Sequence, residues 1–180
     1  MLALCTGMRL GEILALRDGR FDPIKKVIEV REALEETKGM AFKAPKSKAG
    51  RRDLTLPDIV VEVMREHRKQ LLETRLMLGL GKLESDHLLF PHPNGGPLRP
   101  TTVSGDWGDI ADAIGMPEVT FHSLRHSHAS QLIDAGVDIV TISRRLGHAK
   151  PDITLRIYAH LFKKDDSKAT DAINAALGNR

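Results

Sequence analysis

The segment from residue 121 to residue 160 constrains the fold more than any other, because helix start and stop signals divide it into three short helices. The first helix, in FHSLRHSHASQLIDAG, ends at Gly136. Asp138 caps the second helix and Gly147 ends it, so the histidine that follows leaves the helix axis. The third helix, in PDITLRIYAHLF, carries Tyr158, which is the only tyrosine of the chain. The second half of the chain is therefore predicted to be helical.

The first 120 residues predict further helices and a small sheet. Thr6 is expected to cap a helix over residues 6–16, which places Arg9 in its first turn. Runs typical of strands follow, and the loop SKAG is expected to join two of them as a hairpin; the strands cover residues 27–33, 39–46, 52–56 and 87–90.

Longer helices are expected over residues 57–80 and 101–114, and a last amphipathic helix lies within residues 165–180. Trp107 and Ile110 are expected to face the core from the second of these helices. The predicted fold class is α+β, mainly helical, with a small three-stranded antiparallel sheet.

Composition excludes several classes of protein. The 180 residues suit one domain, and no apolar run is long enough to suggest a membrane span. Cys5 is the only cysteine, so no disulfide can form within the chain, and a reducing cytoplasm is the expected compartment. Aromatic residues make up only 4%, which argues against stacking of single-stranded bases but allows recognition of duplex phosphates.

The net charge of +3 is small, but basic residues gather in one segment. No acidic residue interrupts this run between residues 38 and 52, which holds Lys38, Lys43, Lys46, Lys48, Arg51 and Arg52. A basic hairpin can lie along a groove and contact phosphates. A charged edge hairpin that resists aggregation is an equally common reading.

A second set of residues consists of histidines and arginines that could act together with the single tyrosine. His122 and Arg125 are three positions apart and share a helix face, and His148 follows the glycine that ends its helix. An arginine near a helix N-terminus, such as Arg9, favours a bound anion, although pairing with Glu12 is the simpler interpretation. Tyr158 on its own would be interpreted as a core residue.

Metal chemistry is disfavoured by the same residues. The histidines of HSLRHSH could suggest zinc, but no cysteine pair accompanies His122, His126 and His128. No set of converging carboxylates suggests a two-metal nuclease. What remains suits phosphoryl transfer, in which arginines neutralise the phosphate oxygens and a lysine or histidine protonates the leaving alkoxide. A tyrosine, whose pKa is ordinarily about 10, needs a neighbouring base or cations to ionise.

These segments, in their order and spacing, resemble the tyrosine recombinase (phage integrase) family over essentially the whole chain. TGMRLGEILAL is similar to the first arginine box of the family, and APKSKAGRRDLTL is similar to the hairpin that carries its active-site lysine. HSLRHSHAS is similar to the HxxR box, LGH supplies a further histidine, and TLRIYAH supplies the tyrosine.

The resemblance implies a site and a mechanism. The tyrosine attacks a DNA phosphate, forms a 3′-phosphotyrosyl link and releases a 5′-hydroxyl, without a metal, a nucleotide or another cofactor. The arginines clamp the phosphate, the lysine protonates the leaving oxygen, His122 handles the proton of the nucleophile and His148 hydrogen-bonds the phosphate. The implied catalytic residues are Arg9, Lys46, His122, Arg125, His148 and Tyr158. Lys43 and Lys48 flank the best-aligned lysine and, with Arg51 and Arg52, are candidates for DNA contact.

The resemblance also implies partners and domain organisation. Residues 1–180 correspond to the integrase-type catalytic domain without the N-terminal core-binding domain of the family, and residues 165–180 correspond to a helix that docks on a neighbouring protomer. Double-stranded DNA is the expected partner, with a homotetramer on DNA for the full-length protein and a monomer for the isolated domain. The expected function is site-specific recombination. The alternatives are a type IB topoisomerase-like relaxase and a DNA-binding fragment without turnover.

Overall fold

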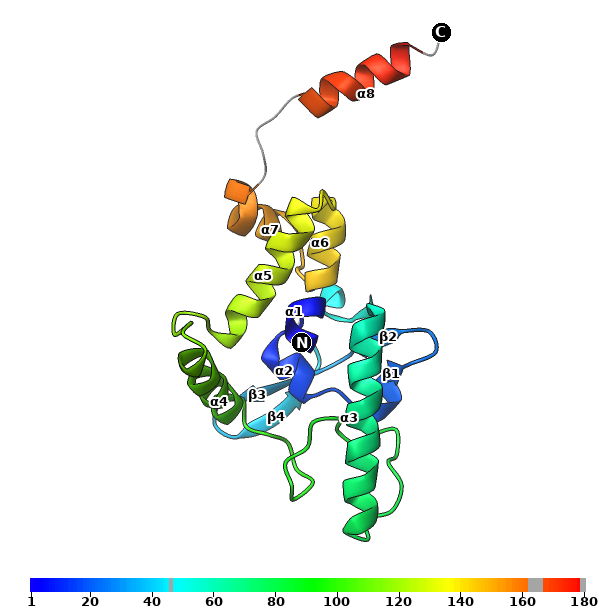
Figure 1. The fold of residues 1–180 in the computed structure, drawn as a ribbon, viewed down its shortest axis with the longest axis vertical. Coiled ribbons are helices and arrows are strands. Elements are labelled where there is room, and N and C mark those ends of the chain that lie inside the picture. The colour runs from blue at the N-terminus through cyan, green and yellow to red at the C-terminus, as the bar shows by residue number, and fades with distance from the viewer. Residues whose placement is uncertain (46, 162–166, 179–180) are drawn as a thin grey trace.

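The computed structural model describes residues 1–45, 47–161 and 167–178 (Figure 1). Its α-helices are α1 (Leu2–Thr6), α2 (Leu10–Leu14), α3 (Asp58–Met77), α4 (Pro100–Ala113), α5 (Phe121–Asp134), α6 (Ile139–Leu146), α7 (Pro151–Tyr158) and α8 (Ser167–Leu177). Short 3-10 helices are η1 (Asp18–Arg20), η2 (Lys48–Gly50) and η3 (Ala159–Leu161). The strands are β1 (Phe21–Asp22), β2 (Val27–Val30), β3 (Ala33–Glu36), β4 (Met40–Lys43) and β5 (Arg52–Thr55). The predicted class, mainly helical α+β, is confirmed.

The strands form two antiparallel sheets, which corrects the predicted pairing. β2 lies between β1 and β5, with Val27 opposite Thr55, whereas β3 and β4 form a separate hairpin with Ala33 opposite Lys43. The predicted strand over residues 27–33 ends at Val30, which pairs with Arg52, and the guanidinium of Arg31 donates to the carbonyl of Arg52 at 3.1 Å. The SKAG loop therefore joins two sheets through η2, and the predicted hairpin between residues 39–46 and 52–56 is wrong.

The predicted helix over residues 6–16 is interrupted. Gly7 adopts a left-handed conformation (φ 66°) and ends α1, and Arg9 is the N-cap of α2 rather than a residue of its first turn. Thr6 is the last residue of α1, and its hydroxyl donates to the carbonyl of Leu2 at 2.7 Å, so it does not cap a helix. A Cβ atom at Gly7 would lie 2.7 Å from a ring carbon of His128, so a larger residue would push α1 off α5.

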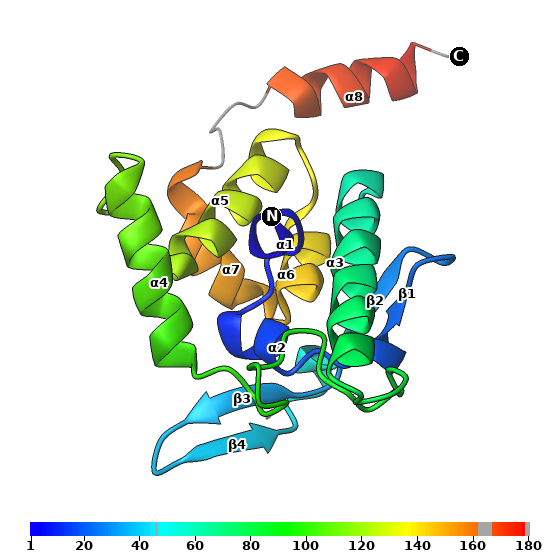
Figure 2. The ribbon, with the colours of Figure 1, turned by 60° about the horizontal axis from the view of Figure 1, so that its bottom comes forward.

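Two apolar clusters hold these elements together. The larger one joins α1, the three-stranded sheet and α3, and includes Met8, Ile28, Leu54, Val60 and Leu89. The smaller cluster lies among α5, α6 and α7 and consists of Ala129, Ile133, Ile142, Leu146 and Tyr158. Figures 1 and 2 both show α5, α6 and α7 grouped beside α1. The contact between α1 and α5 brings the two clusters together.

Most helices predicted after residue 57 are confirmed, but the position of Ile110 and the strand predicted over residues 87–90 are not. Ile110 is 52% exposed and does not face the core, while Trp107 is half-buried and its ring N–H donates to the carbonyl of Val119 at 2.7 Å. Residues 87–90 form no strand, and Leu88 makes only an isolated bridge with Arg17.

α8 lies apart from the other helices in both views, and its apolar residues Ile173 and Leu177 are exposed (Figures 1 and 2). Residues 165, 166, 179 and 180 of the predicted terminal helix lie outside the described residues. Among the described helices, none has the length and apolar character needed to cross a membrane.

Candidate active site

The first arginine of the site is held at the start of α2. The backbone N–H of Arg9 donates to Oε2 of Glu12 at 2.8 Å, and its guanidinium donates to Oε1 at 3.0 Å. The Arg9 side chain remains 44% exposed, whereas that of Glu12 is 3% exposed. The predicted pairing of these two residues is confirmed, and it leaves part of the Arg9 guanidinium open to a ligand.

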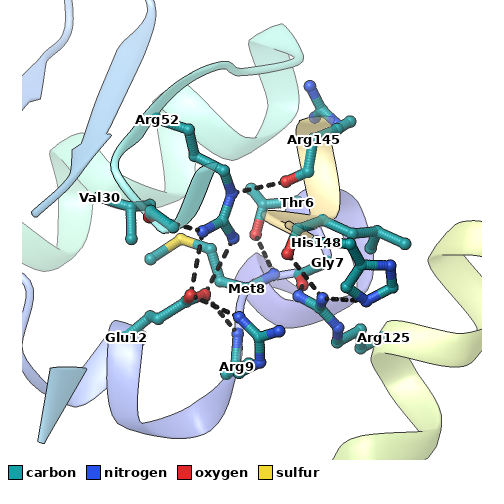
Figure 3. Close-up of polar contacts among 12 residues, drawn as sticks. Thr6, Gly7, Met8, Arg9, Glu12, Val30, Arg52, Arg125, Arg145 and His148 are labelled. Atoms are coloured by element: carbon teal, nitrogen blue, oxygen red, sulfur yellow. Dashed lines mark hydrogen bonds and ion pairs between the residues drawn. The ribbon is translucent and has the colours of Figure 1, made fainter. Parts of the chain in front are cut away.

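Glu12 is shared with a second arginine from the sheet (Figure 3). The guanidinium of Arg52 donates to both carboxylate oxygens of Glu12, at 3.0 and 2.9 Å, and its Nε donates to the carbonyl of Arg145 at 2.6 Å. Burial alone would raise the pKa of Glu12, but hydrogen bonds and charges from Arg52 and Arg9 lower it below its usual value. Arg52 is buried and its guanidinium faces acceptors within the protein, and the expectation that it contacts DNA stays a prediction.

The second predicted phosphate-binding arginine is anchored in the interior. Arg125 is 3% exposed and donates to the carbonyls of Gly7 and Leu146, and to Nε2 of His148 at 3.1 Å. Burial, with the nearby charge of Arg9, lowers the pKa of Arg125 to about 9. The carbonyl acceptors fix the guanidinium between the loop after α1 and the end of α6.

The histidine after Gly147 has a defined tautomer. Because a guanidinium only donates, Nε2 of His148 accepts from Arg125, and Nδ1 carries the hydrogen that it donates to Oγ1 of Thr154 at 2.7 Å. Burial, followed by the charges of Arg125 and Arg9, lowers the pKa of His148 to about 4. His148 is therefore neutral near pH 7 and orients the arginine.

A small cavity of about 110 Å³ gathers three of the predicted residues, Arg9, His122 and Arg125. Its remaining lining comes from α2, α4, α5 and the loop before α2, and consists of Met8, Leu10, Ser104 and Phe121. Burial, followed by the charges of His126, Arg125 and Arg9, lowers the pKa of His122. Two guanidinium-bearing residues and an imidazole around one cavity suit an oxyanion.

Tyr158 lies next to this group but bonds to a residue that the sequence did not assign. Its hydroxyl lies 2.8 Å from Nδ1 of His126, and the His126 ring stands edge-on to that of His122 with centroids 4.8 Å apart. Tyr158 is 3% exposed; burial raises its pKa, and the charge of Arg125 opposes this shift. From the sequence, His126 was considered only as a possible zinc ligand, because a single sequence does not show that α5 and α7 are adjacent.

Apart from Arg52, which binds Glu12, the described basic residues of this segment do not line the cavity. Lys43, on exposed β4, donates to Glu35 at 2.7 Å, and Lys48 and Arg51 are exposed. Lys46 lies outside the described residues. No group of three or more histidine, cysteine or acidic side chains among the described residues is arranged to hold a metal ion.

Solved structures give the class of protein to which this fold belongs. The Tn1549 transposon integrase in complex with transposon right end DNA superposes with a TM-score of 0.75 and 20% identity, over 98% of this chain and 57% of that chain. The XerH site-specific recombinase bound to difH substrate gives a TM-score of 0.62 and 22% identity, over 96% of this chain and 44% of that chain. The fold is therefore the integrase catalytic fold.

The sequence comparison identifies the family. Residues 1–165 match the Phage integrase family, and the chain belongs to that family. The Tyrosine recombinase XerC-like protein of Caldanaerobacter subterraneus subsp. tengcongensis is 29% identical over 187 residues, covering 97% of this chain and 48% of the relative. The ICEBs1 integrase of Bacillus subtilis is 27% identical over 177 residues, covering 98% and 48%. The chain thus spans about half the length of these relatives, and the resemblance drawn from its motifs is confirmed.

Proposed function

We propose that this chain cleaves and rejoins double-stranded DNA at a specific site, with Tyr158 as the nucleophile. The observation that carries the proposal is the shared cavity of Arg9, His122 and Arg125, because it can bind a phosphodiester next to the only tyrosine of the chain. Structural relatives solved with DNA substrates favour duplex DNA as the ligand.

Each residue of the site has a defined part in this reaction. Arg9 and Arg125 neutralise the nonbridging oxygens as the phosphorus becomes five-coordinate. His148 holds Arg125 in place; because its single N–H is directed to Thr154, it would have to release that contact before it could donate to the phosphate, as the family resemblance implies. Lys46 protonates the departing 5′ oxygen, so the leaving group is a neutral hydroxyl.

Rejoining runs the same steps in reverse. The 5′-hydroxyl of another strand attacks the phosphotyrosyl bond, and Tyr158 leaves. The number of phosphodiester bonds is unchanged, so no nucleotide has to be hydrolysed. Tyr158 is 3% exposed, so its side chain or the end of α7 must shift before the hydroxyl can reach the phosphorus.

The proposal extends to assembly. We propose that residues 1–180 act as a catalytic domain that works with a separate DNA-clamping domain, in a homotetramer on two DNA sites. The exposed apolar residues of α8, Ile173 and Leu177, suit docking on a neighbouring protomer. The isolated domain is expected to be a monomer acting on DNA in the cytoplasm.

A covalent trapping assay on a mixture of DNA sequences tests this function. The protein is incubated in EDTA with a pool of duplexes that carry random bases around a single nick. The nick lets the short product strand diffuse away, so cleaved DNA stays attached to the protein. Attached DNA that survives denaturation supports the proposal and yields the target sequence, whereas its absence from the wild-type reaction contradicts it.

A further inference from the structure

The hydroxyl of Tyr158 has a defined partner on another helix. Tyr158 is the last residue of α7, and its Oη lies 2.8 Å from Nδ1 of His126, in the middle of α5. The two rings are tilted at 57° with centroids 5.6 Å apart, so the contact joins the edge of the imidazole to the phenol oxygen.

We propose that His126 holds the Tyr158 hydroxyl and takes its proton when the phosphate is attacked, with His122 next in line. This inference rests on the proposed function, because the proton is released only when Tyr158 acts as a nucleophile. It assigns to His126 the step that the family resemblance assigns to His122.

The arrangement of the two histidines supports this order. They are four residues apart on α5, and their rings meet edge to face at 4.8 Å, at an angle of 82°. His122 lines the cavity with Arg9 and Arg125, while His126 carries the hydrogen bond to the phenol. His126 therefore lies between the nucleophile and His122, which is exposed to solvent.

Two other polar side chains of the site, Arg125 and His148, already have other hydrogen-bond partners. Arg125 is a donor only and is held by Gly7, Leu146 and His148, and the proton of His148 is directed to Thr154. Among the described residues, His126 is thus the base in hydrogen-bond contact with the phenol. Burial favours the neutral phenol, so an acceptor is needed when the oxygen begins to bond to phosphorus.

The proton balance is simple. The Tyr158 O–H bond breaks, its proton binds Nδ1 of neutral His126, and the phenolate oxygen forms a bond to phosphorus. The bond from phosphorus to the 5′ oxygen then breaks, and that oxygen takes a proton from Lys46. When the strands rejoin, the imidazolium of His126 returns its proton to the departing Tyr158 oxygen.

The tautomer of His126 provides a test that requires no DNA. If His126 accepts from the phenol, its free Nδ1 must face Tyr158 and its hydrogen must be on Nε2. Nitrogen-15 NMR of the histidine side chains reports the tautomer, and the signal of this ring is the one lost in His126→Asn. A hydrogen on Nδ1 in the neutral ring would make His126 the donor and overturn the proposal.

Single-turnover adduct formation tests the proton transfer itself, with the nicked DNA selected by the wild-type protein. His126→Asn keeps an amide near the position of Nδ1 but cannot take a proton, so it should slow the adduct by about 100-fold or more. Adduct formation by His126→Ala should be slow, and its rate should recover in part when imidazole is added. His160→Asn, at an exposed position two residues after the nucleophile, should react like wild type.

The outcomes separate the two proposals. A wild-type protein that forms no adduct contradicts the function itself. An active wild type with an equally active His126→Asn variant leaves the function intact and overturns only the role of His126. A slow His126→Ala variant that imidazole does not accelerate would assign His126 a packing role and also overturn it.

Discussion

Arg52 and Glu12 form a buried bidentate ion pair between the three-stranded sheet and α2. The nitrogen-to-oxygen distances are 3.0 and 2.9 Å, and the side chains are 7% and 3% exposed. Glu12 also binds Arg9, so one carboxylate connects the sheet to the arginine that faces the cavity. The pair therefore positions Arg9 at the cavity.

Removal of one partner from this pair should be costly. Arg52→Ala leaves the Glu12 carboxylate buried without its main partner, and we expect the free energy of unfolding to fall by about 3–5 kcal/mol. Chemical denaturation measures this change. Arg51→Ala, at the exposed neighbouring position, should change the same quantity by less than about 0.5 kcal/mol. Equal losses in the two variants would contradict the structural role of Arg52.

His128 should make stability depend on pH. Its Nε2 accepts from Nε of Arg145 at 3.0 Å, and its Nδ1 bonds to the carbonyl of Leu4 at 2.9 Å, so the ring is neutral in the fold. Burial, followed by the charge of Arg145, lowers the pKa of His128 to about 4.

The direction of this pH dependence follows from the protons bound by the folded and unfolded chains. Below an ordinary histidine pKa of about 6.5, the unfolded chain binds a proton that the folded chain does not, so stability decreases as the pH falls toward 4. His128→Gln should reduce this slope in denaturation curves measured between the two values. His160→Gln, at an exposed position, should keep the wild-type slope. An unchanged slope in His128→Gln would show that this ring is not the source.

Gly7 should tolerate no side chain, for two separable reasons. Its φ of 66° is strained for other residues, and a Cβ would lie 2.7 Å from His128 and 2.9 Å from Leu146. Gly79 has a similar φ of 68° with no atom within 4 Å of the same position. Gly79→Ala should therefore lower the unfolding free energy by about 1 kcal/mol, and Gly7→Ala by clearly more. Similar losses would show that the close approach is unimportant.

The local signals of the sequence were sufficient for the helices after residue 57, because caps and stops such as Asp138 and Gly147 act on their own segment. The strand pairing depended on which distant segment β5 meets, and a basic loop between two strands indicated the wrong partner. The burial of Arg52 was missed for a related reason. Arg52 shares a strand face with Leu54, and that alternation is the signal that could have identified it as buried.

The site was predicted as a set of residue types but not as a network. The cavity brings together Arg9, His122 and Arg125, which the motifs had grouped. The bond between Tyr158 and His126 joins residues 32 positions apart, and only the packing of α7 on α5 creates it. The assignment of the active-site lysine stays a prediction.

The most direct measurement of the central claim is the covalent trapping assay with wild type and Tyr158→Phe side by side. The substitution removes one oxygen atom from a buried side chain, so salt-sensitive binding of DNA should be nearly unchanged. We predict a protein–DNA adduct in EDTA that survives denaturation for the wild type and is absent for Tyr158→Phe. An adduct formed equally by the phenylalanine variant would contradict the account.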